Sequence, residues 1–113
     1  MGSTFTIKQG DILPKLRATL KDGTGAVIDL TLATSVRLIV KNYAGQEVVN
    51  ANTTIVSPPT SGIVEYAWIT ANTATAGSFR GEFEINFSTG QVQTVPNDSY
   101  ITIQIIPQLG SQP

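Results

Sequence analysis

The segment spanning residues 79–87 alternates apolar and polar side chains along its whole length. Successive residues of a β-strand point to opposite faces, whereas a helix would place Phe83, Glu84 and Phe87 on one side and bring charge into the core. The alternation therefore predicts a strand with one buried and one exposed face. The buried face would carry Phe79, Phe83, Ile85 and Phe87, with Gly81 between them, and the exposed face Arg80, Glu82, Glu84 and Asn86.

The same period of two recurs through most of the chain. Further strands are predicted at residues 4–8, 13–20, 27–30, 35–41, 46–50, 53–56, 63–69, 91–95 and 99–106. Turns separate them at 22–25 and 57–62, because Gly accepts positive φ and Asp bonds its own backbone. Only residues 70–76 fit a helical turn. Strands every eight to twelve residues with turns between them are typical of a β-sandwich or barrel.

The inward faces of these strands predict one hydrophobic core. Gly81 on a buried face indicates a bulge or close packing, and we expect it beneath Trp68. The expected core residues are Phe5, Leu16, Leu20, Val36, Leu38, Val40, Tyr66, Trp68, Phe83, Ile85, Phe87, Ile101 and Ile103.

Length and composition fit one domain. The chain has 113 residues, and we expect a domain over residues 1–106 and a tail over 107–113. Charged residues make up 13% of the chain, against roughly 25% in typical soluble domains. Two readings of this low charge stay open, a surface covered by partners or a solvent face rich in Thr, Ser, Asn and Gln.

The balance of charge argues against two classes of partner. Seven Lys and Arg oppose eight Asp and Glu, giving a net charge of −1. Nucleic-acid binding needs a basic stripe to neutralise phosphates, so we expect no nucleic-acid partner. The sequence has neither a long apolar run nor a signal-peptide layout. We therefore expect that the protein is made in the cytoplasm and does not associate with a membrane.

The sequence offers few residues for catalysis or metal binding. The chain contains no Cys and no His, which removes the thiolate nucleophile, the commonest metal ligand and the usual acid–base group. We therefore expect no enzyme activity, no metal and no cofactor. The turn aspartates 11, 22, 29 and 98 could suggest calcium, but their spacing favours turn capping.

The paired carboxylates of Glu82 and Glu84 allow one enzymatic hypothesis. They would lie about 6–7 Å apart on one strand face, and carboxylates near that separation can hydrolyse glycosides. Arg80 adjoins them, which favours a solvated or interfacial row of charges.

The aromatic residues Tyr43, Tyr66, Trp68 and Tyr100 could form a sugar-stacking platform, although only Tyr43, beside a turn Gly, is predicted to be exposed. We take Tyr43, Ile39, Arg80, Glu82 and Glu84 as the candidate interface, since Ile39 interrupts an otherwise polar face.

Several short motifs, taken in order, resemble a known family. The chain is similar to the N-terminal domain of phage baseplate upper proteins over residues 5–106. The motifs are FTIKQGDILP from Phe5, LRATLKDG from Leu16, VIDLT from Val27, GIVEYAW from Gly62, TAGSFRGEFEI from Thr75 and VPNDSYI from Val95. They are structural rather than catalytic, so their order carries the resemblance.

The resemblance implies an immunoglobulin-like antiparallel β-sandwich of about seven or eight strands, located in a tailed-phage virion. It implies docking to other tail or baseplate subunits and assembly in several copies. Longer members of the family carry segments that present receptor-binding proteins, and this chain is expected to lack them. The strand at 99–106 could be an edge that a neighbouring subunit extends, or an interior strand. A carbohydrate-binding or adhesin-type module is the alternative function, and it requires Tyr43 to form an exposed pair with Tyr66 or Tyr100.

Overall fold

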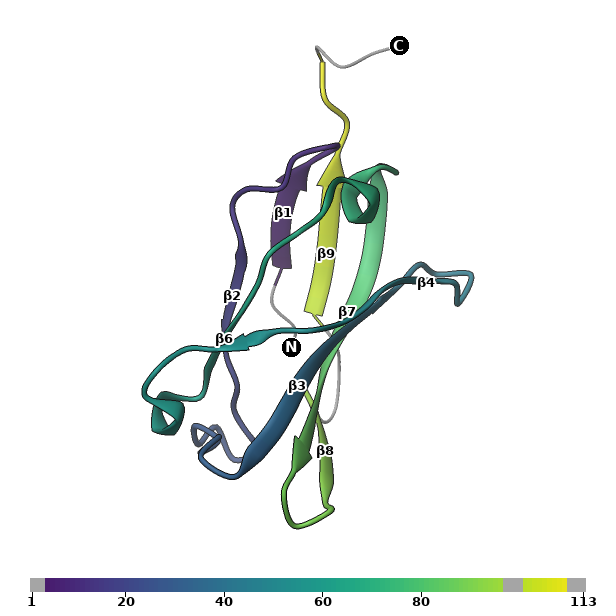
Figure 1. The fold of residues 1–113 in the computed structure, drawn as a ribbon. Helices are drawn as coiled ribbons and strands as arrows, with labels where there is room; N and C mark the ends of the chain where they lie inside the picture. Colours follow the sequence, from purple (N-terminus) through teal and green to yellow (C-terminus); the bar gives the residue numbers. More distant parts are fainter. Residues whose placement is uncertain (1–3, 97–100, 110–113) are drawn as a thin grey trace.

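The computed structural model describes residues 4–96 and 101–109, and these form a sandwich of two β-sheets (Figure 1). Short 3-10 helices, η1 and η2, lie in two of the connections. Within the described residues the elements are β1 Thr4–Lys8, β2 Leu16–Thr19, β3 Ala33–Lys41, β4 Glu47–Asn52, β5 Thr54–Ile55, η1 Pro59–Ser61, β6 Ile63–Tyr66, η2 Thr70–Thr73, β7 Gly77–Phe87, β8 Val92–Val95 and β9 Ile101–Ile106.

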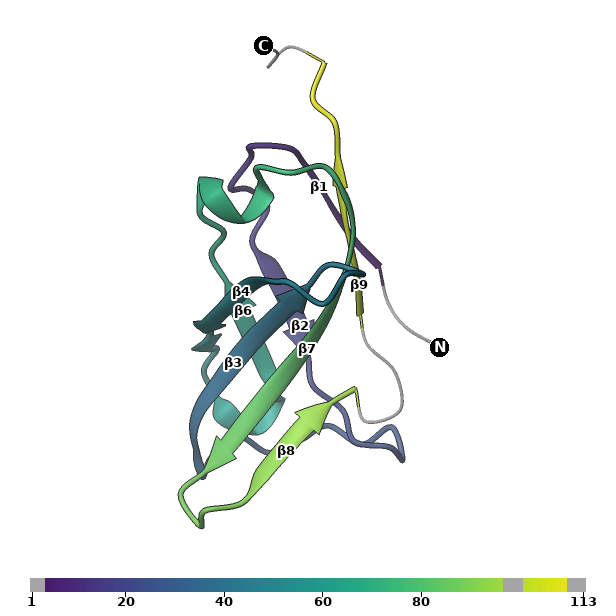
Figure 2. The same cartoon turned by 90° about the vertical axis from the view of Figure 1, so that its right-hand side faces the viewer.

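The larger sheet is built around β7, the strand with the clearest alternation. Its order is β1-β9-β7-β3-β4, and β8 also pairs with β7. One side of β7 pairs with β3, while the other side pairs with β9 at Gly77–Gly81 and with β8 at Phe83–Asn86. Strands β8 and β9 therefore follow one another along a single side of β7 (Figure 2).

The first and last strands pair in parallel, which differs from a wholly antiparallel sandwich. Thr4 lies opposite Thr102, and Lys8 lies opposite Ile106. Parallel neighbours need a long connection, and here almost the whole chain connects them. Strand β9 lies between β1 and β7, so the hypothesis of an edge strand at 99–106 is wrong for its described part, 101–106.

The smaller sheet has the order β2-β6-β5 and is antiparallel. The Arg17 guanidinium and the Glu65 carboxylate form an ion pair at 3.0 Å on directly opposed residues. The two sheets match the immunoglobulin arrangement. In the smaller sheet β2, β6 and β5 stand where the second, fifth and fourth immunoglobulin strands lie, and in the larger sheet β3, β7 and β9 stand where the third, sixth and seventh lie. The fold is thus an immunoglobulin-like all-β sandwich.

The core lies between the two sheets. Ten of the thirteen expected core residues are buried: Leu16, Leu20, Val36, Leu38, Val40, Tyr66, Trp68, Phe83, Ile85 and Ile103. Phe5, Phe87 and Ile101 are only half-buried and pack against this core, because each lies at or near the end of its strand. Eight further apolar residues are buried: Ile7, Ile28, Leu30, Val49, Val64, Phe79, Val95 and Ile105.

Two glycines are required by close approach. At Gly81 a Cβ atom would lie 3.0 Å from Ile101 Cγ1, so close packing is present, but beneath Ile101 rather than Trp68. Gly62 ends η1 with a φ of 67°. A Cβ atom there would lie 2.6 Å from Val27 Cγ1 and 2.8 Å from the Ile28 carbonyl oxygen.

Candidate protein-binding surfaces

The outer face of the larger sheet gathers the residues that the sequence nominates as an interface. Cross-strand pairing places Ile39 opposite Glu82, Lys41 opposite Arg80 and Arg37 opposite Glu84. Because strand side chains alternate, these six share the face that points away from the core. Five of these residues, together with Tyr43 from the turn after β3, form what we call the β3–β7 patch. Its members are Ile39, Lys41, Tyr43, Arg80, Glu82 and Glu84.

Tyr43 is the exposed aromatic residue of this patch. It lies in the turn after β3 and exposes 58% of its surface. The Arg80 guanidinium carbon lies 4.9 Å from the centroid of the Tyr43 ring, a cation–π contact. Ile39, Arg80, Glu82 and Glu84 are half-buried. The patch therefore combines an aromatic ring, an aliphatic side chain and both signs of charge, a mixture suited to protein contact.

A shallow depression lies within the patch. Its volume is about 240 Å³, and its lining residues are Ile39, Lys41, Arg80 and Glu82. Glu82 shares this lining with two basic residues, which fits an interfacial charge row better than an acid–base pair.

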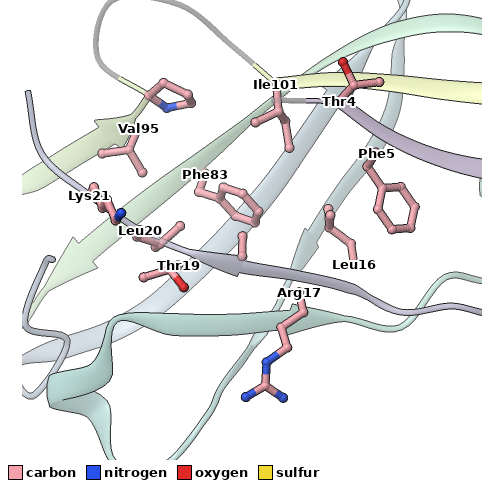
Figure 3. Close-up of a pocket in the computed structure, with 12 residues that line it drawn as sticks. Thr4, Phe5, Leu16, Arg17, Thr19, Leu20, Lys21, Phe83, Val95 and Ile101 are labelled. Atoms are coloured by element: carbon pink, nitrogen blue, oxygen red, sulfur yellow. The ribbon is translucent and has the colours of Figure 1, made fainter. Parts of the chain in front are cut away.

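A larger groove lies on the open side of the sandwich, between β2 and the larger sheet. Its volume is about 470 Å³. We call it the β2 groove. Its apolar lining comes from both sheets, and Figure 3 shows Phe5, Leu16 and Phe83 pointing into the space between them while Arg17 points away. Sequence reasoning missed this groove, because an alternating pattern does not say which strand lacks a neighbour.

The remaining aromatic residues are mostly internal. Trp68 exposes 3% of its surface, stacks on Phe5 at 5.6 Å between ring centroids and meets Tyr66 edge-on at 5.1 Å. Tyr66 is buried and donates its hydroxyl hydrogen to Asn72 Oδ1 at 2.7 Å. Burial raises the pKa of Tyr66 above its ordinary value. An exposed Tyr43–Tyr66 pair is therefore wrong, and Tyr100 lies outside the described residues.

Two of the turn aspartates, Asp22 and Asp29, bond within their own turns. Asp22 Oδ1 accepts hydrogen bonds from the Thr24 hydroxyl and from the Thr24 and Ala26 amides. Asp29 Oδ1 accepts from the Thr31 hydroxyl and amide. In each case the threonine hydroxyl is the main group that holds the carboxyl pKa below its ordinary value. Asp98 lies outside the described residues, among which no three acidic side chains gather as a metal site.

Two buried polar residues after β6 were not predicted. Asn72 Oδ1 also accepts from the Ile69 amide, and the Thr73 hydroxyl donates to the Asp11 carbonyl at 2.9 Å. The Gly10 amide donates to the Thr73 carbonyl. The Thr73 bonds fasten η2 to the β1–β2 loop, and the Asn72 bonds hold the start of η2 to β6, so both residues have a structural role. The tail begins beside this loop, where Gln108 Nε2 donates to Asp11 Oδ1 at 3.3 Å.

No helix in the described part of the chain has the length and apolar character needed to cross a membrane.

Comparison with known proteins supports the fold alone. No family model matches the sequence. No curated protein matches it either. A solved structure that is similar is CopC from Methylosinus trichosporium OB3b, with a TM-score of 0.53 and 12% identity, over 98% of this chain and 91% of that chain. This likeness agrees with a β-sandwich and, at such low identity, says nothing about a shared role.

Proposed function

We propose that the protein is a non-enzymatic structural component of a tailed-phage virion, in the tail, neck or baseplate, that docks to other tail subunits. It would be made in the host cytoplasm and present in several copies in the particle. The observation that carries the proposal is the ordered set of motifs that resembles baseplate upper proteins, because the described parts of these motifs fall mostly on strands and turns of the sandwich which that resemblance implies. They cover β1, β2, β6, most of β7 and the start of β9.

The composition and the β3–β7 patch support a binding role over catalysis. The sequence has no His and no Cys, and its nominated carboxylate, Glu82, lies beside Lys41 and Arg80. Subunits of a particle need surfaces that recur in symmetric contacts. An exposed Tyr next to an Arg is a common centre for such contacts, since Tyr and Arg are enriched among residues that dominate binding energy.

Mass spectrometry of density-purified particles from cells that produce this chain tests the proposal. The chain is quantified against the major tail protein. A fixed ratio that fits a three-, six- or twelvefold ring is expected, because copies of one subunit usually assemble with closed symmetry. Absence from intact particles would refute a place in the mature virion.

Variants then test the patch. Tyr43→Ala and Arg80→Ala are expected to lower incorporation into particles while leaving the melting temperature close to that of the wild type. Leu32→Ala is the matched control, because Leu32 is also an exposed large side chain, at 59%. It precedes β3, whereas Tyr43 follows that nine-residue strand. The two positions are therefore roughly 30 Å apart at the usual strand rise. Equal incorporation of all three variants would exclude the patch as the docking surface.

A further inference from the structure

The outward edge of β2 is open. Strand β2 ends the order β2-β6-β5, so β6 is its only sheet neighbour among the described residues. In constant-type immunoglobulin domains the first strand lies beside the second in this sheet. Here β1 pairs with β9 in the other sheet instead, and β2 is left without that neighbour.

The hydrogen-bonding pattern shows which groups of β2 point outward. The Leu20 amide donates to the Gly62 carbonyl at 2.7 Å, which fixes the phase of the antiparallel ladder. Because bonded and non-bonded pairs alternate, Ala18 and Leu16 bond to β6, while the backbone groups of Arg17 and Thr19 turn away from it. The outward edge thus presents two amides and two carbonyls.

The β2 groove runs along this edge. Residues 16–21 form one wall, and the apolar floor includes Phe5, Phe83, Val95 and Ile101 (Figure 3). A strand added to β2 would lie about 4.8 Å from it in the plane of the smaller sheet, and it would face the larger sheet across the usual spacing of about 10 Å. Alternate side chains of that strand would then enter the groove, whose volume of about 470 Å³ falls in the usual range for binding cavities, about 300–1,000 Å³.

The charged residues around the β2 groove indicate which kind of segment would bind there. Lys21 is exposed on the β2 wall, and Lys15 comes just before it. Arg17 is exposed too, paired with Glu65, and none of the described residues that line the groove is acidic. A segment with acidic side chains on its outward face would complement this wall. Lysines also protect edge strands from pairing at random, so only a partner that neutralises them gains a stable fit.

We infer that the β2 groove binds an extended peptide segment of a partner protein by strand addition. The segment pairs with Arg17 and Thr19 through its backbone, inserts apolar side chains at alternate positions, and carries acidic side chains towards Lys21. About six residues are needed to span residues 16–21 at about 3.3 Å per residue. The inference depends on the geometry of β2 and holds whether or not the protein belongs to a virion.

Amide hydrogen exchange on the free ¹⁵N-labelled protein gives the first test. The Arg17 and Thr19 amides are expected to exchange quickly and the Ala18 amide slowly, since only Ala18 bonds to β6. Protection of Arg17 and Thr19 equal to that of Ala18 would overturn the inference, because the edge would already be covered by the protein itself.

Peptide selection gives the second test. A displayed library of linear twelve-residue peptides is selected on the immobilised protein, and the tightest binder is synthesised. We expect alternating apolar residues with acidic residues between them, and at least tenfold slower exchange at Arg17 and Thr19 when that peptide is added. Failure to enrich any peptide, or protection confined to other strands, would overturn the inference.

Two variants complete the design. Thr19→Pro removes one outward amide, which an edge strand tolerates, and should weaken the selected peptide at least tenfold. Asn52→Pro is the matched control: the Thr53 amide donates to the Val36 carbonyl, so the Asn52 amide points outward from β4, away from the groove. If Thr19→Pro fails to fold, Ala18→Phe, which fills the groove from β2, replaces it. Undiminished affinity in the folded variant would refute strand addition.

Discussion

Replacement of Gly62 by alanine should destabilise the protein through two separable effects. The residue has a φ of 67°, and an L-residue in this left-handed region loses about 1–2 kcal/mol. The new Cβ would also lie 2.6 Å from Val27 Cγ1 and 2.8 Å from the Ile28 carbonyl oxygen. Overpacking of this kind costs typically about 1–3 kcal/mol. The free energy of unfolding should therefore fall by about 2–5 kcal/mol.

The backbone part of this clash is hard to relieve. The Ile28 amide donates to the Leu20 carbonyl at 2.9 Å, and the Leu20 amide donates to the Gly62 carbonyl at 2.7 Å. Ile28 and Gly62 are thus both tied to Leu20, so moving the two residues apart would strain these bonds. In the double variant Val27→Ala/Gly62→Ala we expect only part of the lost stability to return, because the side-chain contact is removed while the carbonyl contact stays.

Gly45→Ala is the matched control. Gly45 has a φ of 88°, and a Cβ atom there would meet nothing within 4 Å. It should lose only the left-handed cost of about 1–2 kcal/mol. Urea unfolding at 25 °C, followed by the fluorescence of Trp68, the single tryptophan, measures both variants. A Gly62→Ala loss no larger than that of Gly45→Ala would refute the close approach of Val27 and Ile28 to Gly62.

Further predictions concern the core and the acid limb of stability. Trp68→Ala or Phe83→Ala should lower the unfolding free energy by about 3–5 kcal/mol. Trp68→Phe should cost much less, because Trp68 Nε1 has no hydrogen-bond partner in the described chain. Both Trp68 variants lack the tryptophan, so their urea unfolding is followed by circular dichroism, and equal losses would refute this. The pKa of Asp22 is lowered in the folded protein, so its carboxylate stabilises the fold at pH values above its ordinary pKa of 3.8. This stabilisation is lost as the pH falls through the lower pKa of the folded state. Asp22→Asn should therefore flatten the acid limb of the urea midpoint against pH; an unchanged limb would contradict the turn bonds. With no His, the midpoint should stay constant from about pH 6 to 8, and a step there would show an unexpected titrating group.

The strands were predictable where one face meets the core and the other meets solvent. Residues 79–87 all lie in β7, and Phe83 and Ile85 are buried as their alternation requires. Period-two patterning reports burial directly, so the identity of most core residues followed from it. The exposed position of Tyr43 followed from a turn signal in the same way.

The failures come from contacts between distant segments. Leu30 is 1% exposed although it belongs to no strand, and its amide donates to the Pro59 carbonyl. Nothing local to Leu30 encodes that partner. The open edge of β2 likewise depends on β1 pairing with β9 rather than with β2, a choice made by the whole fold. Gly81 was understood as a packing residue, but its neighbour, Ile101, could not be identified from sequence spacing.

The pairing of β1 with β9 bears on how the chain folds during synthesis. Thr4 pairs with Thr102, so the first strand leaves the ribosome long before its partner exists. At about 5–20 residues per second the delay is roughly 5–20 s. Until then β1 has no partner strand among the described elements, and the side of β7 that faces β9 is open along Gly77–Gly81. Contacts of such high sequence separation slow folding, so these strand edges stay open to wrong pairing until the last strand emerges.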